Sequence, residues 1–355
     1  MNISNAPLIF DGHNDVLYRL LMDGGMAALD SFSRGRDGHI DLPRAKKGGF
    51  AGGFFALFAP SDDLDEGSFE AMLAPAYDLP LPAPVAHSRA LAVIMEKAAM
   101  LLALERRGAL TICTDTAQMR RCFETGRMAA IMHIEGAEAI DAELNALEVL
   151  HAAGLRSLGP VWSRPTIFGH GVPFRFPSTP DTGPGLTDAG KRLVRRCNAL
   201  GIMLDLSHLN EAGFWDVARI SDAPLVATHS NAHAICPHAR NLTDAQLDAI
   251  AESDGMVGLN FAAAFLREDG QMNPDVPLET LLRHLDHLIG RLGEDRVGFG
   301  SDFDGAVVPA DIGDVAGLPA LGKAMAAHGY DDKLLKKLGH ENWLRVLERT
   351  WGQGA

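Results

Sequence analysis

The sequence has no long hydrophobic run and no recognisable targeting segment. Its 355 residues contain no stretch of 18 or more apolar residues, so a transmembrane helix is not expected. The first five residues, Met1-Asn2-Ile3-Ser4-Asn5, lack the basic segment and apolar stretch of a secretory signal. We therefore expect a cytoplasmic protein with no membrane partner.

Cysteine and positive charge are also scarce. The four cysteines form neither a CxxC motif nor a zinc-ribbon spacing, which favours buried free thiols at Cys113, Cys122, Cys197 and Cys236. The 32 Lys and Arg residues are outnumbered by 46 Asp and Glu residues, giving a net charge of −14. This balance argues against a nucleic-acid partner, which requires a basic face. Bound divalent cations would offset part of the negative charge.

Short apolar runs alternate with longer segments of helical periodicity. Alternation of this kind builds a parallel sheet, and eight units in a chain of this length predict a (β/α)₈ TIM barrel spanning residues 1–355 as a single domain. An open, doubly wound sheet is the main alternative, but no glycine-rich phosphate-binding fingerprint follows the first strand. The expected strands are Leu8–Phe10, Phe50–Phe58, Met128–Ile134, Leu155–Val161, Ile202–Leu206, Pro224–Ala227, Gly255–Asn260 and Arg296–Gly300.

Helices are expected between these strands. The capping-box sequence Thr243-Asp244-Ala245-Gln246 predicts one helix start. Apolar periodicity predicts further helices over 140–150, 193–200, 278–292 and 342–351. Two Pro-rich segments, Pro60–Val85 and Arg164–Gly185, are expected to be irregular insertions on the C-terminal face of the barrel, as substrate wall, lid or inert surface.

Side chains of the kind that bind metals recur where the predicted strands end. The C-terminal ends of parallel barrel strands lie on one face, so these side chains should converge. They are His13 and Asp15 after the first strand, His133 and Glu135 at the third, Asp205 and His208 at the fifth, His229 at the sixth, and Asp302 and Asp304 at the eighth. A set of this size is sufficient for two metal ions.

The residue types suggest individual roles. Glu135 has two oxygens and can bridge two cations, with His13 and Asp15 completing the shell of one ion and His208 and His229 that of the other. Mixed imidazole and carboxylate ligands without thiolate suit two Zn²⁺ ions, with other divalent metals as alternatives. A water bridging the two ions would act as a hydroxide nucleophile.

Other roles are expected for Asp302, His133 and Asp205. Asp302 is the natural proton shuttle to a leaving amine, although it could simply close a turn with Asp304. His133 is an alternative ligand, and Asp205 is expected behind the ligands or in a structural role.

Several ordered motifs resemble the renal (membrane) dipeptidase family of zinc peptidases. The similarity extends over nearly the whole chain, through Asp11-Gly12-His13-Asn14-Asp15, His39-Ile40-Asp41-Leu42-Pro43, Glu135-Gly136, Asp205-Leu206-Ser207-His208, Thr228-His229-Ser230, Arg240-Asn241 and Ser301-Asp302-Phe303-Asp304-Gly305. The resemblance implies a binuclear zinc centre in a (β/α)₈ barrel, with Asp302 transferring protons. It also implies that Arg240 binds the substrate carboxylate, and that the substrates are dipeptides, often with a D-residue at the C-terminal position.

One position departs from the family pattern. Trp162 stands where the family carries a histidine that polarises the substrate carbonyl. An indole offers one neutral N–H, so Arg164 or His170 takes over that role, or Trp162 walls a pocket for a different substrate. Asn260, at the end of the seventh strand, is a further candidate for substrate binding.

Three functions are compatible with this sequence. The leading interpretation is a zinc-dependent dipeptidase. The alternatives are a binuclear-metal amidohydrolase acting on another small amide, an N-acyl amino acid or a lactone, and a non-catalytic binder of metal or peptide. Oligomeric state stays open, with a homodimer as one option, because apolar residues at 261–266 could form either an interface or the wall of a pocket.

Overall fold

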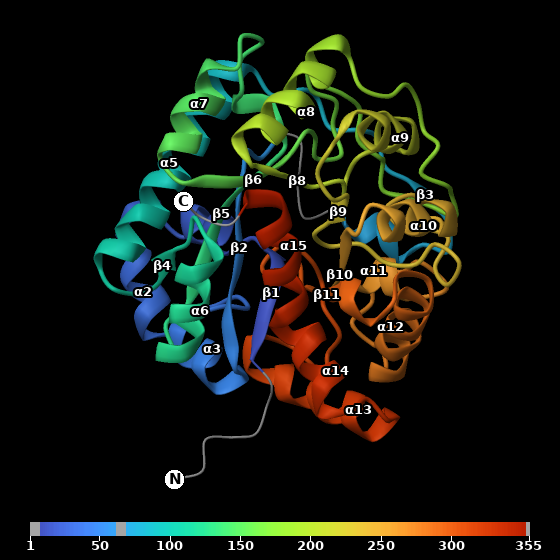
Figure 1. Ribbon diagram of the computed structural model, residues 1–355. Helices are drawn as coiled ribbons and strands as arrows, with labels where there is room; N and C mark the ends of the chain where they lie inside the picture. The colour runs from blue at the N-terminus through green and yellow to red at the C-terminus, as the bar shows by residue number, and fades with distance from the viewer. Residues whose placement is uncertain (1–7, 62–68, 353–355) are drawn as a thin grey trace.

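The computed structural model describes residues 8–61 and 69–352. Parallel strands form its centre, and helices surround them (Figure 1). All eight expected strands are present, with ends that differ from the expected bounds by a few residues. They are β1 (Ile9–Asn14), β2 (Phe50–Phe58), β5 (Ala129–Glu135), β6 (Leu155–Gly159), β8 (Met203–Leu204), β9 (Val226–Ala227), β10 (Met256–Asn260) and β11 (Val297–Gly300). The short strand β4 (Thr111–Ile112) adds to the start of β5.

The order of the strands makes the sheet a barrel. Neighbours run β8-β6-β5-β2-β1-β11-β10-β9, and every pairing along this path is parallel. The two end strands meet at a parallel bridge between Asp205 and Val226, where the Leu206 amide donates to the Val226 carbonyl at 2.9 Å. The expected (β/α)₈ barrel is confirmed, and the open-sheet alternative is wrong.

The barrel interior is filled in layers, because alternate residues of each strand point inward. The lower layer is apolar and consists of Phe10, Phe54, Ile131, Met203, Val226 and Met256, with Trp343 packed beneath it. Along β5 the same inward face continues from Ile131 through His133 to Glu135. Polar side chains thus occupy the upper layers, above a closed apolar floor.

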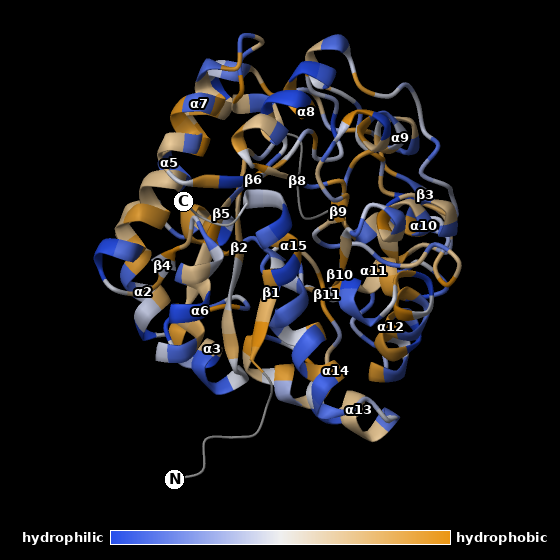
Figure 2. Ribbon diagram, viewed as in Figure 1, coloured by the Kyte–Doolittle hydropathy of each residue, from blue (hydrophilic) through white to orange (hydrophobic). Residues whose placement is uncertain are grey.

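Helices surround the strands, and their apolar faces turn toward the sheet (Figure 2). They are α1 (Val16–Met22), α2 (Leu29–Arg34), α3 (Leu42–Gly48), α5 (His87–Arg106), α6 (Thr116–Thr125), α7 (Asn145–Ala152), α8 (Asp188–Leu200), α9 (Glu211–Ile220), α10 (Asp244–Glu252), α11 (Ala263–Leu266), α12 (Leu278–Leu292), α13 (Leu318–His328), α14 (Asp332–Lys336) and α15 (Asn342–Trp351).

The expected helix boundaries are confirmed in most cases. Thr243 and Gln246 form both hydrogen bonds of a capping box at the start of α10. The helix expected from residue 140 is wrong in its first part, because Leu144 adopts a left-handed conformation with φ of 66° and α7 begins only at Asn145.

The two insertions are more ordered than the sequence suggested. A two-residue strand in each, β3 (Tyr77–Asp78) and β7 (Arg175–Phe176), pairs with the other in antiparallel fashion. The Leu79 amide extends this contact by donating to the Phe174 carbonyl at 3.0 Å. Residues 62–68 of the first insertion lie outside the described residues.

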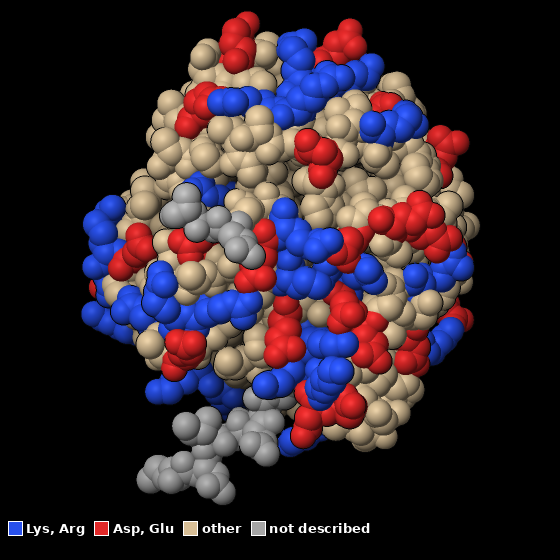
Figure 3. All heavy atoms as spheres, in the orientation of Figure 1, with Lys and Arg blue, Asp and Glu red and all other residues tan. Residues whose placement is uncertain are grey.

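The cysteines are buried, and charged side chains of both signs lie on the surface seen in Figure 3. Cys113, Cys122, Cys197 and Cys236 are buried free thiols, as expected. No helix within residues 8–61 and 69–352 is long and apolar enough to cross a membrane. On the face in Figure 3, basic and acidic side chains are interspersed.

Candidate metal centre

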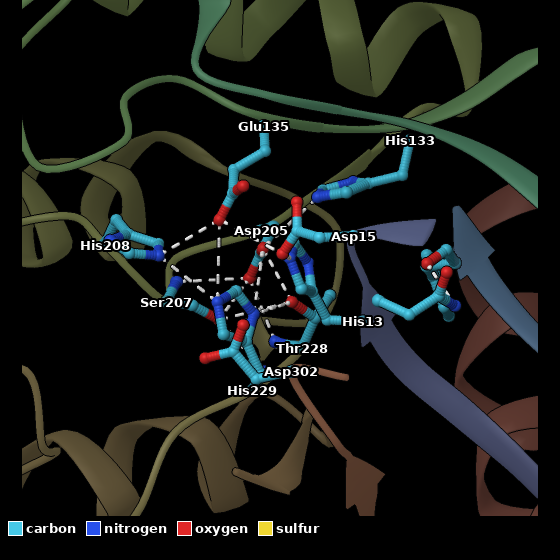
Figure 4. A network of polar contacts seen from close by, with 12 residues as sticks. His13, Asp15, His133, Glu135, Asp205, Ser207, His208, Thr228, His229 and Asp302 are labelled. Carbon is cyan, nitrogen blue, oxygen red and sulfur yellow. Dashed lines mark hydrogen bonds and ion pairs between the residues drawn. The ribbon is translucent and has the colours of Figure 1, made fainter. Parts of the chain in front are cut away.

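Glu135 lies at the centre of a cluster of buried histidines at the C-terminal end of the barrel (Figure 4). Its Oε1 atom is 3.0 Å from His208 Nε2 and 3.6 Å from Nε2 of both His13 and His229. Asp15 Oδ2 approaches His13 Nε2 at 3.3 Å. The structure therefore brings together the five residues that the sequence proposed as metal ligands.

These residues form two groups that share Glu135. In the group of His13, Asp15 and Glu135, and in the group of Glu135, His208 and His229, the donor atoms all lie within 4.8 Å of one another. A carboxylate shared between two sets of buried nitrogen and oxygen donors suits a pair of divalent cations. The donor set therefore fits the metals that the sequence implies.

Strand alternation explains how Glu135 reaches the centre, and His13 lies at an irregularity in strand pairing. Alternation along β5 places Glu135 on the inward face, two positions beyond His133. The pairing of β1 with β2 shifts register between Asp11 and Asn14, around His13.

Asp15 and Asp302 come together at a glycine. A Cβ atom on Gly305 would lie 2.2 Å from Asp15 Oδ2 and 2.8 Å from Asp302 Oδ1. Any side chain at this position would push the two carboxylates out of place, which explains the glycine in the Asp302–Gly305 turn.

Asp205 organises the site from behind. Its carboxylate accepts hydrogen bonds from the hydroxyls of Ser207 and Thr228, both at 2.6 Å, and from the Thr228 amide at 2.9 Å. Thr228 Oγ1 is also 2.8 Å from His229 Nδ1. Because the Thr228 hydrogen is directed to Asp205, His229 Nδ1 must donate, and its Nε2 presents a lone pair to the centre.

His133 is directed to other partners. Its Nδ1 is 2.9 Å from the Ser157 hydroxyl, and its Nε2 is 3.7 Å from Asp205 Oδ2. Among the described residues, His133 belongs to none of the groups whose donor atoms converge, although Asp205 forms a third group with His13 and His229.

Burial and crowding of acidic groups shape the electrostatics. Burial raises the pKa of Glu135 to about 8, with the carboxylates of Asp15 and Asp302 adding to the effect. Burial alone would lower the pKa of His13, but the charges of Glu135 and Asp15 outweigh it and raise the pKa to about 10. The centre therefore favours additional positive charge, which divalent cations provide.

Asp302 lies at the edge of this centre, facing Asn260. The Asn260 side-chain amide donates to Asp302 Oδ2 at 3.0 Å, and the Asp302 backbone is left-handed, with φ of 59°. Burial raises the pKa of Asp302. Asp304 instead accepts hydrogen bonds from the His39 amide and the Arg36 guanidinium, at 2.7 Å and 3.0 Å, and is structural.

Arg240 lies against the histidines on the side of Phe265. Its Nε is 3.2 Å from His208 Nδ1, and its Nη atoms donate to the Ser230 hydroxyl at 3.1 Å and to the His229 carbonyl at 3.0 Å. Burial lowers its pKa to about 10, so it stays a cation at neutral pH. The structure places Arg240 beside the centre with its guanidinium already engaged.

A cavity of about 110 Å³ opens beside the candidate ligands. Asp15, Glu135, His208 and Asp302 contribute to its floor, and the wall is largely aromatic. The insertions contribute to this wall, as one of the alternatives above expected. The apolar residues of the wall are Tyr18, Phe58, Pro60, Phe69, Trp162, Phe174, Phe265, Met272 and Ala306.

Trp162 packs within this wall. Its ring centroid is 5.0 Å from that of Phe58, 5.6 Å from that of Phe174 and 5.9 Å from that of His208. The sequence offered no signal for the other wall residues, because isolated aromatic residues are far more often part of a core.

The two proposed substitutes for the family histidine have other contacts. Arg164 is buried, with its Nε 2.6 Å from Glu138 Oε1 and its Nη1 donating to the Ser61 hydroxyl at 2.9 Å. His170 Nδ1 lies 3.3 Å from the Gly185 carbonyl. Neither residue lines the cavity.

This chain is similar over most of its length to several known proteins. This chain is similar to a metallopeptidase from Rhodobacter sphaeroides whose crystal structure contains a phosphinate mimic of the dipeptide L-Ala-D-Ala. The two structures superpose with a TM-score of 0.96, and the sequences are 59% identical. The match covers 98% of this chain and 100% of that one. An uncharacterised protein of Klebsiella pneumoniae from the pqqA 5′ region is 53% identical over 246 residues, covering 69% of this chain and 91% of that protein.

Two further comparisons agree. An uncharacterised protein of Acinetobacter calcoaceticus from the PQQ-III 3′ region is 41% identical over 302 residues, covering 80% of this chain and 90% of that protein. The sequence pattern of membrane dipeptidases matches residues 2–352. With this match over almost its entire length, the chain belongs to the membrane dipeptidase family, peptidase family M19.

Proposed function

We propose that this protein is a zinc-dependent dipeptidase that uses two metal ions to hydrolyse the peptide bond of dipeptides. The observation that carries the proposal is the pair of ligand groups that share Glu135 at the floor of an aromatic cavity. Membership of a dipeptidase family supports the reaction class. Imidazole nitrogens combined with carboxylate oxygens are donors that zinc commonly binds, which motivates zinc as the metal.

The substrate is proposed to be a dipeptide with small side chains. The similar metallopeptidase from Rhodobacter sphaeroides holds a mimic of L-Ala-D-Ala, which motivates a D-residue at the C-terminal position. The cavity here is small, at about 110 Å³, and its wall consists of apolar rings. Such a wall favours methyl-sized apolar side chains over long or charged ones, because a buried charge would lack a partner.

The residues of this chain then have distinct roles. His13, Asp15, Glu135, His208 and His229 would hold the divalent cations, which supply Lewis acidity toward an attacking water and the substrate carbonyl. Asp302 takes a proton from the water and gives it to the leaving amine. Its raised pKa suits this exchange, since a group that both accepts and donates works best near the operating pH.

Three other residues bind the substrate or position Asp302. Arg240 carries the charge that recognises a free C-terminal carboxylate, and each Nη atom, which donates one hydrogen bond within the protein, has a second N–H to offer it. Asn260 holds Asp302 in place through its 3.0 Å hydrogen bond. Trp162 walls the cavity against Phe58 and Phe174.

The test begins with protein stripped by a chelator and reloaded with zinc. Hydrolysis of L-Ala-D-Ala and L-Ala-L-Ala is measured alongside N-acetylalanine and a small lactone, and bound zinc is counted by elemental analysis. We expect about two zinc ions per chain, dipeptide hydrolysis with zinc, and none after stripping.

Each other outcome has a definite meaning. Fewer than one zinc ion per chain at saturating zinc would contradict the metal centre. Hydrolysis of the acyl amino acid or lactone in place of the dipeptides would favour the broader amidohydrolase. Full zinc loading with no hydrolysis of any compound would identify a binding protein.

A further inference from the structure

A lysine interrupts the buried apolar face of helix α5. The residues that this helix turns toward the barrel include Ala90, Ile94, Leu101 and Leu104, at the three- and four-residue spacing of a helix face. Lys97 occupies the central position of the same stripe and has no exposed surface. An aliphatic side chain would satisfy the packing there, so the charge needs a separate explanation.

The ammonium group of Lys97 lies behind the wall of the active-site cavity. Its Nζ is 5.1 Å from the ring centroid of Tyr18 and 5.7 Å from that of Phe58, and both rings line the cavity. Among the described residues, Nζ has no hydrogen-bond partner. Two ring faces offset only part of the cost of burying an ammonium group.

Arg164 is a second buried cation in this region, and it has an acidic partner. Its guanidinium also stacks on Phe58, at 5.1 Å from the ring centroid, but it forms an ion pair with Glu138 at 2.6 Å and donates to Ser61. The charge of Arg164 is therefore neutralised within the wall. Within residues 8–61 and 69–352, Lys97 Nζ has no comparable hydrogen-bonded partner.

The acidic groups that act on Lys97 belong to the candidate centre. Burial lowers the lysine pKa to about 8, while the carboxylates of Asp15 and Glu135 oppose this change. The side chain thus stays largely protonated at neutral pH, and the two carboxylates that oppose the change are both members of one proposed ligand group.

We propose that Lys97 is a positioning residue whose buried positive charge, held behind the aromatic wall at Tyr18 and Phe58, acts on Asp15 and Glu135 and weakens the binding of divalent cations at the centre. This inference rests on the proposed function, because it assumes that Asp15 and Glu135 bind metal. The charge of Lys97 favours the ionised forms of Asp15 and Glu135 over their protonated forms, and it repels a divalent cation that binds between them. Lys97 therefore limits how tightly the centre holds its metals.

The test measures zinc affinity by competition with a fluorescent chelator. Lys97→Met removes the charge and keeps the side-chain length, Lys97→Gln is a second neutral variant, and Lys97→Arg retains the charge. Lys323→Met, at an exposed lysine of α13, is the matched control. We expect both neutral variants to bind zinc about tenfold more tightly, with Lys97→Arg and the control close to wild type.

The sign of the change separates this role from a structural one. A lysine that merely supports the wall would, when replaced, loosen the centre and weaken zinc binding. Unchanged or weaker affinity in the neutral variants would overturn the proposal, as would their failure to fold. Failure of the wild-type chain to bind zinc would instead overturn the proposed function.

Discussion

The Thr228 hydroxyl lies 2.8 Å from Nδ1 of His229, the residue that follows it in the chain. Because this hydroxyl also donates to Asp205 at 2.6 Å, it can only accept from the imidazole. The hydrogen bond places the imidazole proton on Nδ1 and leaves Nε2 to face Glu135. A residue outside the proposed ligand set thus selects the tautomer that a metal ligand requires.

Replacement of Thr228 tests this arrangement. Thr228→Val keeps the shape of the side chain but removes the acceptor for His229, and we expect zinc affinity to fall about 10–100-fold. Chelator competition gives the affinity. Thr116→Val, which removes a hydroxyl of α6 that lies near Glu348 of α15, serves as the control and should leave zinc affinity unchanged. Equal affinity in Thr228→Val and wild type would show that the tautomer does not depend on this contact.

Asp302 is expected to matter for turnover more than for metal content. Asp302→Asn preserves size and the contact with Asn260 but cannot accept a proton, so kcat should fall about 10²–10⁴-fold. Elemental analysis should still find the wild-type number of zinc ions. Asp311→Asn, at an exposed position, is the matched control. Unchanged turnover in Asp302→Asn would remove this residue from the mechanism.

Arg240 should act on substrates that carry a free carboxylate. We expect Arg240→Ala to raise KM for L-Ala-D-Ala about 10–100-fold, while the corresponding dipeptide amide is affected much less. Zinc content must be measured in parallel, because Arg240 Nε also contacts His208 at 3.2 Å. An equal effect on both compounds would favour a substrate without a carboxylate.

The barrel and the candidate ligands could be predicted because each strand end carries its own local signal. Glu135 ends one short apolar run, and His208 and His229 follow two more, so one assumption about parallel strands brings them together. The start of α7 was less predictable. Leu144 fits the apolar spacing, but its left-handed backbone delays the helix by one turn.

Contacts between segments far apart in the chain could not be predicted from the sequence. Strands β3 and β7 pair across about a hundred residues, each with two residues and no alternation to reveal it. The partners of Arg240 and the position of Lys97 beside Tyr18 depend on how helices pack on the barrel. Such placements follow from tertiary packing and leave no periodic trace.

Asp41 gives a pH-dependent prediction away from the centre. Its carboxylate caps α3 by accepting from the Arg44 amide at 2.9 Å, and it pairs with Arg44 Nε at 2.7 Å. Burial alone would raise its pKa, but the hydrogen bonds and charge of Arg44 lower it below the ordinary 3.8. The resulting stability is complete above pH 3.8 and is lost as the pH falls through the lower folded pKa.

Asp41→Asn should therefore lower the free energy of unfolding by about 1–2 kcal/mol near neutral pH. The difference from wild type should narrow once the pH falls below 3.8. Urea unfolding at neutral pH and in steps down to about pH 3 measures both values. A difference that stays constant across this range would show that the charge of Asp41 contributes nothing.

Trp162 occupies the position at which the family resemblance places a carbonyl-polarising histidine, and two roles for it can be separated. If the indole is a wall, its rings matter and its N–H does not, since the wall contacts run to Phe58 and Phe174. We expect Trp162→Phe to keep kcat for L-Ala-D-Ala within about threefold of wild type, with a change mainly in KM, because uniform binding affects KM alone. Trp215→Phe, on α9, controls for the loss of an indole. A kcat lower by about 10²–10³-fold would instead show that the indole N–H stabilises the oxyanion, because that is the effect of removing one such donor.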